Sequence, residues 1–138
     1  MGISLRREWV EPLLEAQPRL PALEVIFEQW LFASDEALGQ LESLRERYSM
    51  LLHCLSMNLG STDPLDHDYM ERVRSFAERF EIHSISDHLS WRSSRGRWSL
   101  SLLPLPRTEE ALGHLSNRVD EVQLFLGRSI ALENVSQY

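Results

Sequence analysis

The stretch Met50-Leu-Leu-His-Cys-Leu-Ser-Met-Asn-Leu-Gly60 is a short apolar run that contains one histidine, His53. Two later stretches, residues 84–91 and 129–135, repeat the pattern of an apolar run that ends near a polar side chain. A segment with helical periodicity separates each stretch from the next. Short apolar strands that alternate with helices are typical of a parallel sheet covered by helices. The three stretches therefore predict a βα protein.

A side chain able to bind a metal ion stands toward the end of each stretch, and these are His53, His88 and Glu133. In parallel βα folds, ligands bind at the carboxyl ends of the strands. Imidazole and carboxylate ligands together suit iron, manganese or zinc. A single histidine in a strand is more often a hydrogen-bonded core residue. Three such groups at three strand ends favour a shared metal site.

The hydrophobic pattern predicts strands that begin near residues 2, 23, 50, 82 and 129, with helices over 6–17, 34–48, 67–80 and 107–126. A complete eight-stranded barrel takes roughly 250 residues. We therefore predict an α/β fold that is the N-terminal half of a TIM (β/α)8 barrel, with about five βα units. The expected organisation is one partial barrel domain over residues 1–138, truncated after the fifth strand.

Residues 91–106 do not fit this alternation and are polar at their start. We interpret them as a long loop, and long loops in compact domains often carry function. Arg92, Arg95 and Arg97 cluster there, between two tryptophans. They could grip a peptide carboxylate, but a solvated loop is the alternative that we favour.

Composition limits the classes of function. The chain has 138 residues, of which 43% are hydrophobic and 25% charged, as in a globular domain. The net charge of −7 and the scattered arginines argue against a nucleic-acid partner. No apolar run approaches the roughly 20 residues of a membrane helix. The single cysteine, Cys54, should face the core, opposite His53, and fits a reducing, cytoplasmic compartment.

A half-barrel would leave its first and fifth strands unpaired and, we expect, an apolar face of the sheet uncovered. Something should cover these surfaces. The sequence therefore predicts self-association, or pairing with a separate chain that completes the barrel; a third alternative is that the chain is a piece of a longer protein.

The following motifs, in chain order, carry a family resemblance: Gly2-Ile-Ser-Leu-Arg-Arg-Glu8, Leu23-Glu-Val25, Leu52-His53, Leu59-Gly-Ser61, Asp63-Pro-Leu65, Ser86-Asp-His-Leu-Ser-Trp91, Leu102-Leu-Pro-Leu-Pro106, Thr108-Glu-Glu-Ala-Leu112 and Leu132-Glu-Asn134. Together they resemble the multinuclear non-haem iron-dependent oxidative enzymes. That family includes the methanobactin biosynthesis oxidase and the enzyme of peptide-derived 3-thiaglutamate formation. The resemblance spans almost the whole chain.

The resemblance implies a xylose-isomerase-like barrel that holds two or three iron ions. Family members use iron and dioxygen to modify cysteine residues of ribosomally made precursor peptides, often with a partner protein that delivers the peptide. By position, His53 matches the first histidine ligand, His88 the histidine of a Ser-Glu-His-Leu-like motif, and Glu133 the glutamate of a Glu-Asn motif. The family's remaining ligands lie on later strands.

The chain departs from the family pattern at two places. Residues 26–29 read Ile-Phe-Glu-Gln where the family has His-Ala-Glu-Asn, and Asp87 replaces a common glutamate. A metal-binding histidine needs an acceptor for its other ring nitrogen. The candidates for this acceptor are Glu28, Asp87 and Asn134, and Arg92 is a candidate for holding substrate.

Two hypotheses of function follow. The first is an iron- and dioxygen-dependent oxidase of precursor peptides, complete only with further strands and with no catalytic residue assigned. The second is a non-catalytic, truncated barrel that binds a partner. A weaker third option is another metal-dependent barrel activity, such as an isomerase or a phosphodiesterase, with zinc or manganese in place of iron.

Overall fold

The structure is a computed structural model that describes residues 2–135. Its main sheet contains the strands β1 (Ile3–Ser4), β2 (Ala22–Ile26), β3 (Ser49–His53), β4 (Ser84–His88) and β7 (Ile130–Glu133). These strands lie in the order β1-β2-β3-β4-β7, and every neighbouring pair is parallel. The five strands predicted from the sequence therefore form one parallel sheet.

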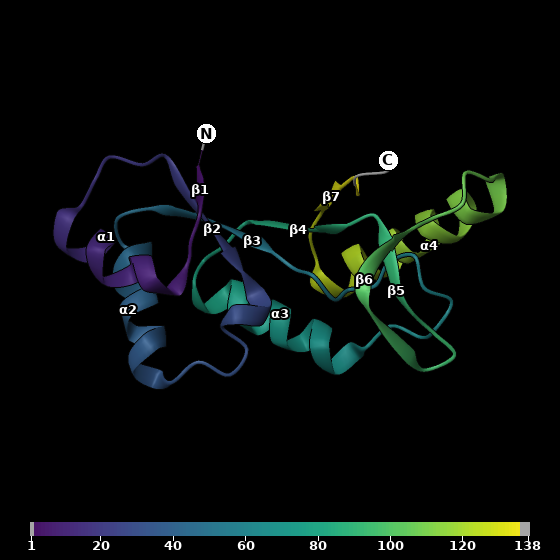
Figure 1. Cartoon of the computed structure of the whole chain (residues 1–138), viewed down its shortest axis with the longest axis horizontal. Coiled ribbons are helices and arrows are strands. Elements are labelled where there is room, and N and C mark those ends of the chain that lie inside the picture. The colour runs from purple at the N-terminus through teal and green to yellow at the C-terminus, as the bar shows by residue number, and fades with distance from the viewer. Residues whose placement is uncertain (1, 136–138) are drawn as a thin grey trace.

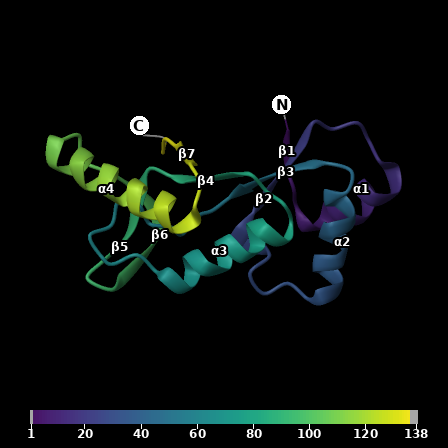
Figure 2. The ribbon, with the colours of Figure 1, turned by 180° about the vertical axis from the view of Figure 1, so that it is seen from behind.

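Helices connect the strands and cover one side of the sheet. They are α1 (Val10–Ala16), α2 (Asp35–Arg45), α3 (His67–Arg79) and α4 (Glu109–Leu126), with short 3-10 helices η1 (Arg7–Trp9) and η2 (Phe27–Gln29). Figure 1 shows the strands side by side across the molecule with α2 and α3 below them. Figure 2, from behind, shows α4 alongside α3. Within the described part of the chain, no helix is long and apolar enough to cross a membrane.

Polar side chains fix where the longer helices begin. The side chains of Ser34, Asp66 and Thr108 each accept a hydrogen bond from a backbone N–H of the following first turn. Such caps satisfy N–H groups that have no partner within the helix. Gly127 ends α4 with a positive φ of 65°, a conformation that glycine adopts without strain. The helix predicted over residues 107–126 is therefore confirmed.

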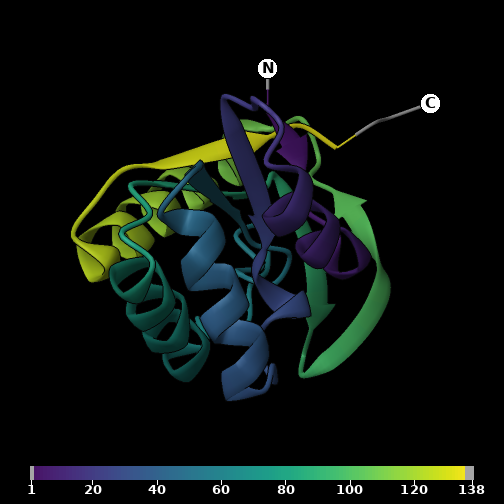
Figure 3. The same ribbon diagram turned by 90° about the vertical axis from the view of Figure 1, so that its left-hand side faces the viewer.

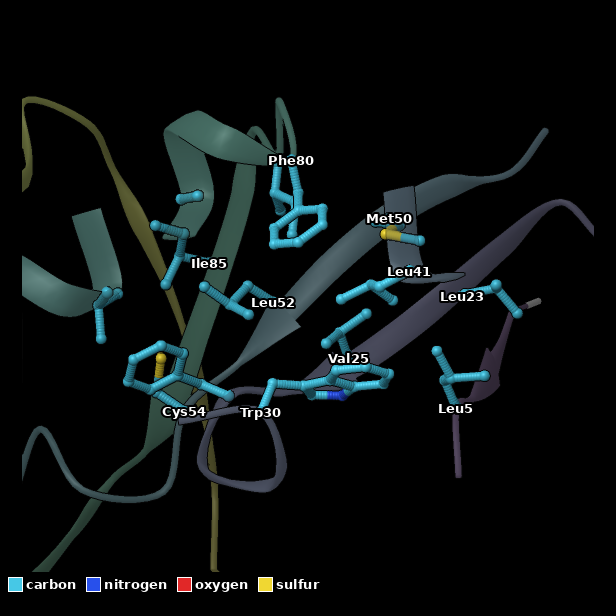
Figure 4. Packing of buried hydrophobic residues seen from close by; sticks show 14 of the residues in the cluster. Leu5, Leu23, Val25, Trp30, Leu41, Met50, Leu52, Cys54, Phe80 and Ile85 are labelled. Carbon is cyan, nitrogen blue, oxygen red and sulfur yellow. The ribbon is translucent and has the colours of Figure 1, made fainter. Parts of the chain in front are cut away.

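The hydrophobic core lies between the sheet and its helices. Alternate strand residues point into it, such as Leu23 and Val25 of β2 and Leu52 of β3 (Figure 4). Cys54 follows β3 and has no exposed surface, as the alternation predicts. Burial raises the pKa of its thiol well above the usual range. The cysteine is therefore a core residue.

The other face of the sheet is more polar than we expected. Strand register places Leu51 beside Ser84, and His53 beside Ser86, on this face. In parallel strands, paired residues point to the same side of the sheet. Leu51 is the largest exposed apolar side chain there, at 39% exposure. The expectation of an apolar uncovered face was wrong, because serines alternate with the core residues along β4.

Residues 91–106 also differ from the prediction. They belong largely to an antiparallel hairpin of β5 (Ser90–Ser94) and β6 (Arg97–Pro104), not to a long loop. Arg95 and Gly96 form the turn with φ values of 53° and 72°. Two consecutive residues with positive φ are typical of the tight turns that match strand twist. Figure 3 shows the hairpin on the opposite side of the molecule from α2 and α3.

The loop after β3 attaches this hairpin to the sheet. Asn58 donates a side-chain hydrogen bond to Ser93 Oγ (2.7 Å) and accepts one from the Arg92 N–H (2.7 Å). The Asp63 carboxylate accepts hydrogen bonds from Ser93 Oγ and from the backbone N–H groups of the turn. Gly60 lies so close to Ser90 that an added Cβ would meet its carbonyl oxygen at 2.8 Å. The hairpin is therefore held at the carboxyl ends of β3 and β4.

Candidate metal centre

His53, His88 and Glu133 converge at the carboxyl ends of β3, β4 and β7. The Nε2 atom of His53 lies 3.7 Å from Glu133 Oε2, and that of His88 lies 4.0 Å from the same oxygen. The three ligand atoms all lie within 4.8 Å of one another. The two imidazole rings are nearly perpendicular, with centroids 4.7 Å apart. Three residues from distant parts of the sequence thus share one small volume.

Strand register explains this convergence. His88 is the last residue of β4 and pairs with Glu133 of β7, so both side chains point to the same face. His53 is the last residue of β3 and pairs with Ser86, two residues before His88. Residues two apart in a strand share a face. The parallel sheet therefore brings all three groups to the face opposite the helices.

Ser86 fixes the orientation of the His53 ring. Its Oγ lies 2.8 Å from His53 Nδ1 and 3.4 Å from the carbonyl oxygen of Leu52, to which the hydroxyl donates. When the hydroxyl donates to Leu52, it can accept a hydrogen bond from Nδ1–H. In that tautomer the lone pair of Nε2 faces Glu133. An imidazole held in this way is ready to bind a cation through Nε2.

Asp87 lies behind His88. Its carboxylate is 1% exposed and accepts hydrogen bonds from the backbone N–H groups of Met57 and His88. Burial raises the pKa of Asp87. One carboxylate oxygen lies 3.7 Å from His88 Nδ1, a buried atom with no hydrogen-bond partner within the described chain. The carboxylate raises the pKa of His88. Asp87 is thus placed to interact with the ring nitrogen that faces away from Glu133.

Two other candidates from the sequence lie elsewhere. Glu28 accepts hydrogen bonds from the Leu55 N–H (2.9 Å) and the Tyr69 hydroxyl (2.7 Å), so its carboxylate supports the loop after β3 and not a histidine ring. Asn134 lines a cavity of about 620 Å³ between the ends of β4 and β7 and the start of α4. Neither of these two side chains is hydrogen-bonded to His53 or His88 within the described chain.

The three hairpin arginines have different environments. Arg95 and Arg97 are exposed, as expected for a solvated segment. Arg92 is half-buried and donates from Nη1 to the Leu55 carbonyl oxygen (3.0 Å) and, more weakly, to Ser56 Oγ (3.5 Å). Arg92 therefore reaches the end of β3, whereas its neighbours point to solvent.

Some structural roles were missed in the sequence. Arg118 of α4 is buried and donates to the carbonyl oxygens of Ser61 and Asp63, which fixes the loop that holds the hairpin. His114 of the same helix has its Nε2 2.7 Å from Ser61 O. Both side chains lie on one face of α4 and point toward that loop. Helical periodicity places them on the same face, but it does not identify the loop as their partner.

Comparisons with known proteins place the chain among relatives about twice its length. The family of the RiPP precursor modification enzyme MbnB/TglH/ChrH matches residues 1–138. A UPF0276 protein of Acaryochloris marina is 41% identical over 99% of this chain and 49% of the relative. A UPF0276 protein of Anaeromyxobacter sp. is 40% identical over 99% of this chain and 48% of the relative. The chain thus spans about half the length of these curated relatives.

The fold resembles that of a solved structure. The crystal structure of a D-tagatose 3-epimerase-like protein superposes with a TM-score of 0.54 at 17% identity, over 100% of this chain and 54% of that chain. At that identity the likeness shows the fold alone. Five parallel strands alternating with helices match half of a TIM-like barrel, which confirms the predicted fold class.

Proposed function

The chain belongs to the family of the RiPP precursor modification enzyme MbnB/TglH/ChrH, and from this premise we propose that it provides the metal-binding half of an iron- and dioxygen-dependent oxidase. The substrate would be a ribosomally made precursor peptide, modified at cysteine residues. One observation carries the proposal: the ligand atoms of His53, His88 and Glu133 lie within 4.8 Å of one another on the open face of the sheet.

The donor set fits iron. Two imidazoles and one carboxylate with open coordination positions are the ligands of many non-haem Fe(II) oxygenases. At a metal–nitrogen distance of roughly 2.1 Å, two donors on one ion lie at most about 4.2 Å apart. The distances of 3.7 and 4.0 Å from Glu133 Oε2 to the two histidines fall within that limit, and the three donors together lie within 4.8 Å of one another, slightly beyond it. Small side-chain rotations would bring the three donors onto one ion.

The surrounding residues suit this use of the site. Ser86 directs Nε2 of His53 toward Glu133, and Asp87 faces the other ring nitrogen of His88. Iron bound there would supply the one-electron and dioxygen chemistry that protein side chains lack. The Glu133 side chain is 61% exposed, so a peptide can approach from the side opposite the helices. The residues of the chain would thus bind the iron, orient the histidine rings and leave the site accessible to a peptide.

Iron content tests the proposal. Protein purified anaerobically with Fe(II) should retain stoichiometric iron, and His53→Ala should lose it. His83→Ala is a matched control, because His83 is exposed and precedes β4. Iron content that is unaffected by His53→Ala would contradict the proposal. A second step exposes the loaded protein to dioxygen with a synthetic cysteine-bearing precursor peptide, and mass spectrometry should detect a change in mass at cysteine.

A second candidate function is a non-catalytic scaffold that pairs with another chain. The supporting observation is that β1 and β7 each have one neighbour in the described sheet, which leaves a free hydrogen-bonding edge on each. We propose that a second copy or a separate chain pairs with these edges and completes the barrel. Size-exclusion chromatography with light scattering should then detect an oligomer. A cooperative monomer would contradict this pairing, and bound iron without peptide modification would favour the scaffold over the oxidase.

A further inference from the structure

Arg92 on β5 is anchored at one end of its guanidinium group. Nη1 donates to the Leu55 carbonyl oxygen and approaches Ser56 Oγ, and the backbone N–H of Arg92 donates to Asn58 Oδ1. These contacts hold the residue from both backbone and side chain. The long side chain therefore has little freedom, and its charge stays at the carboxyl end of β3.

This charge has no counter-ion within residues 2–135. No carboxylate of the described chain forms an ion pair with Arg92, and its Nε is buried without a hydrogen-bond partner. The buried Arg118, by contrast, lies 3.5 Å from Glu121. A half-buried cation without a partner costs free energy unless a ligand compensates it. The charge of Arg92 is therefore available to an anionic ligand.

Arg92 also lies beside the candidate metal centre. The carbonyl group that it contacts belongs to Leu55, two residues after His53. β5 begins two residues after His88. An anion held by Arg92 would therefore lie near His53 and His88.

We propose that Arg92 binds a carboxylate of the substrate peptide and so positions the peptide at the centre formed by His53, His88 and Glu133. The carboxylate is either the C-terminus of the peptide or an Asp or Glu side chain. Arginine suits this task, because its planar guanidinium can donate two parallel hydrogen bonds to one carboxylate. Nη1 is engaged by Leu55 and Ser56 and Nε is buried, which leaves Nη2, with no hydrogen-bond partner within the described chain, as the nitrogen that meets the ligand. This inference rests on the proposed function and assigns one residue to peptide recognition.

Three small peptides test the proposal by calorimetric titration. They are N-acetyl-Cys-Gly with a free carboxylate, the same dipeptide as its C-terminal amide, and N-acetyl-Asp-Cys-Gly amide. Wild-type protein should bind at least one carboxylate-bearing peptide about tenfold or more tightly than the neutral amide, the range expected for a charge-assisted hydrogen bond. Preference for the first peptide identifies a C-terminal carboxylate, and preference for the third identifies an acidic side chain.

Variants show whether Arg92 is responsible. Arg92→Gln should abolish the preference for the carboxylate, and Arg92→Lys, which keeps the charge but not the planar fork, should retain only part of it. Arg95→Gln is the matched control, because Arg95 lies on the same hairpin but is exposed, and it should keep the full preference. Thermal melting shows which variants are folded, and Arg92→Lys keeps the test valid if Arg92→Gln does not fold.

Three results would overturn the proposal: equal affinity of the wild type for acid and amide peptides, no binding of any of them at millimolar concentration, or an unchanged preference in folded Arg92 variants. The titrations are carried out with and without Fe(II), which separates this inference from the proposed function. A carboxylate preference that depends on Arg92 in protein unable to bind iron would contradict only the proposed function. Iron binding that requires His53, without a carboxylate preference, would contradict only the role of Arg92.

Discussion

The central strands and the edge strand of the sheet contribute to the candidate centre in different ways. The side chains of His53 and His88, at the ends of β3 and β4, are 8% and 12% exposed, whereas that of Glu133 on β7 is 61% exposed. β3 and β4 each have strand neighbours on both sides, and β7 has one in the described sheet. The two histidines are therefore fixed by packing, and the carboxylate is left free to adjust. From this difference we infer that the two histidines are rigid ligands and that Glu133 is a ligand that can change its conformation.

The largest expected effect concerns stability. Leu52 of β3 is 1% exposed, and Leu132 of β7 is 42% exposed, although both point to the helix side of the sheet. Leu52→Ala should lower the free energy of unfolding by about 2–5 kcal/mol, because it leaves a cavity in the core. Leu132→Ala should cost less than about 1 kcal/mol. Urea denaturation of both variants measures the difference, and equal losses would contradict the contrast between centre and edge.

The affinity for Fe(II) should also depend more on a ligand from a central strand than on the ligand from the edge strand. His53→Ala should weaken Fe(II) binding by more than about 100-fold, since losing only an outer hydrogen-bond partner of a ligand already costs 10–100-fold. Glu133→Ala should weaken it by about tenfold, because water can enter an exposed position. Competition with a chromophoric chelator under anaerobic conditions measures both affinities. A larger loss for Glu133→Ala than for His53→Ala would reverse the assignment of rigid and pliable ligands.

A smaller effect should follow from removing the hydroxyl group that orients His53. Ser86→Ala removes the acceptor of the Nδ1 hydrogen bond and should weaken Fe(II) binding by about tenfold. Ser84→Ala is the control, because Ser84 lies on the same strand and face but is exposed and precedes the site. The same chelator competition applies. Identical affinities for the two serine variants would show that the ring is oriented by other contacts.

The smallest effect concerns the hairpin that carries Arg92 beside the central strands. Hydrogen bonds from the Ser93 hydroxyl and the Gly96 N–H lower the pKa of Asp63 from its usual 3.8. A lowered pKa in the folded state means that the carboxylate stabilises the hairpin above about pH 4, and that this contribution is lost as pH falls through the folded pKa. The amide NMR signals of Arg95 and Gly96 should titrate with a midpoint below 3.8. They should not titrate in Asp63→Asn, and a midpoint above 3.8 would contradict the assigned contacts.

Much of the architecture could be predicted because it depends on local pattern. The hydrophobic pattern located both the strands and the helices between them. The meeting of His53, His88 and Glu133 followed from the geometry of parallel strands, whose carboxyl ends lie at one rim. Whether these groups bind a metal stays a prediction.

Other features depend on register and packing that a single sequence does not reveal. Ser86 meets His53 because β3 and β4 pair with that register, and Arg118 is buried because α4 lies against the loop at Ser61. Two signals were present but misread. Gly96 between two possible strand segments is a turn signal, because glycine adopts a positive φ without strain, and the serines of β4 indicate a polar open face.

Iron itself provides the most direct test of the centre. Crystals of the chain grown or soaked anaerobically with Fe(II) should show an anomalous scattering peak at the iron edge. The peak should lie within about 2.0–2.2 Å of His53 Nε2, His88 Nε2 and a Glu133 carboxylate oxygen, the usual range for such metal–ligand bonds. A peak bound by other residues, or no peak near either histidine in fully loaded crystals, would contradict the proposed metal centre.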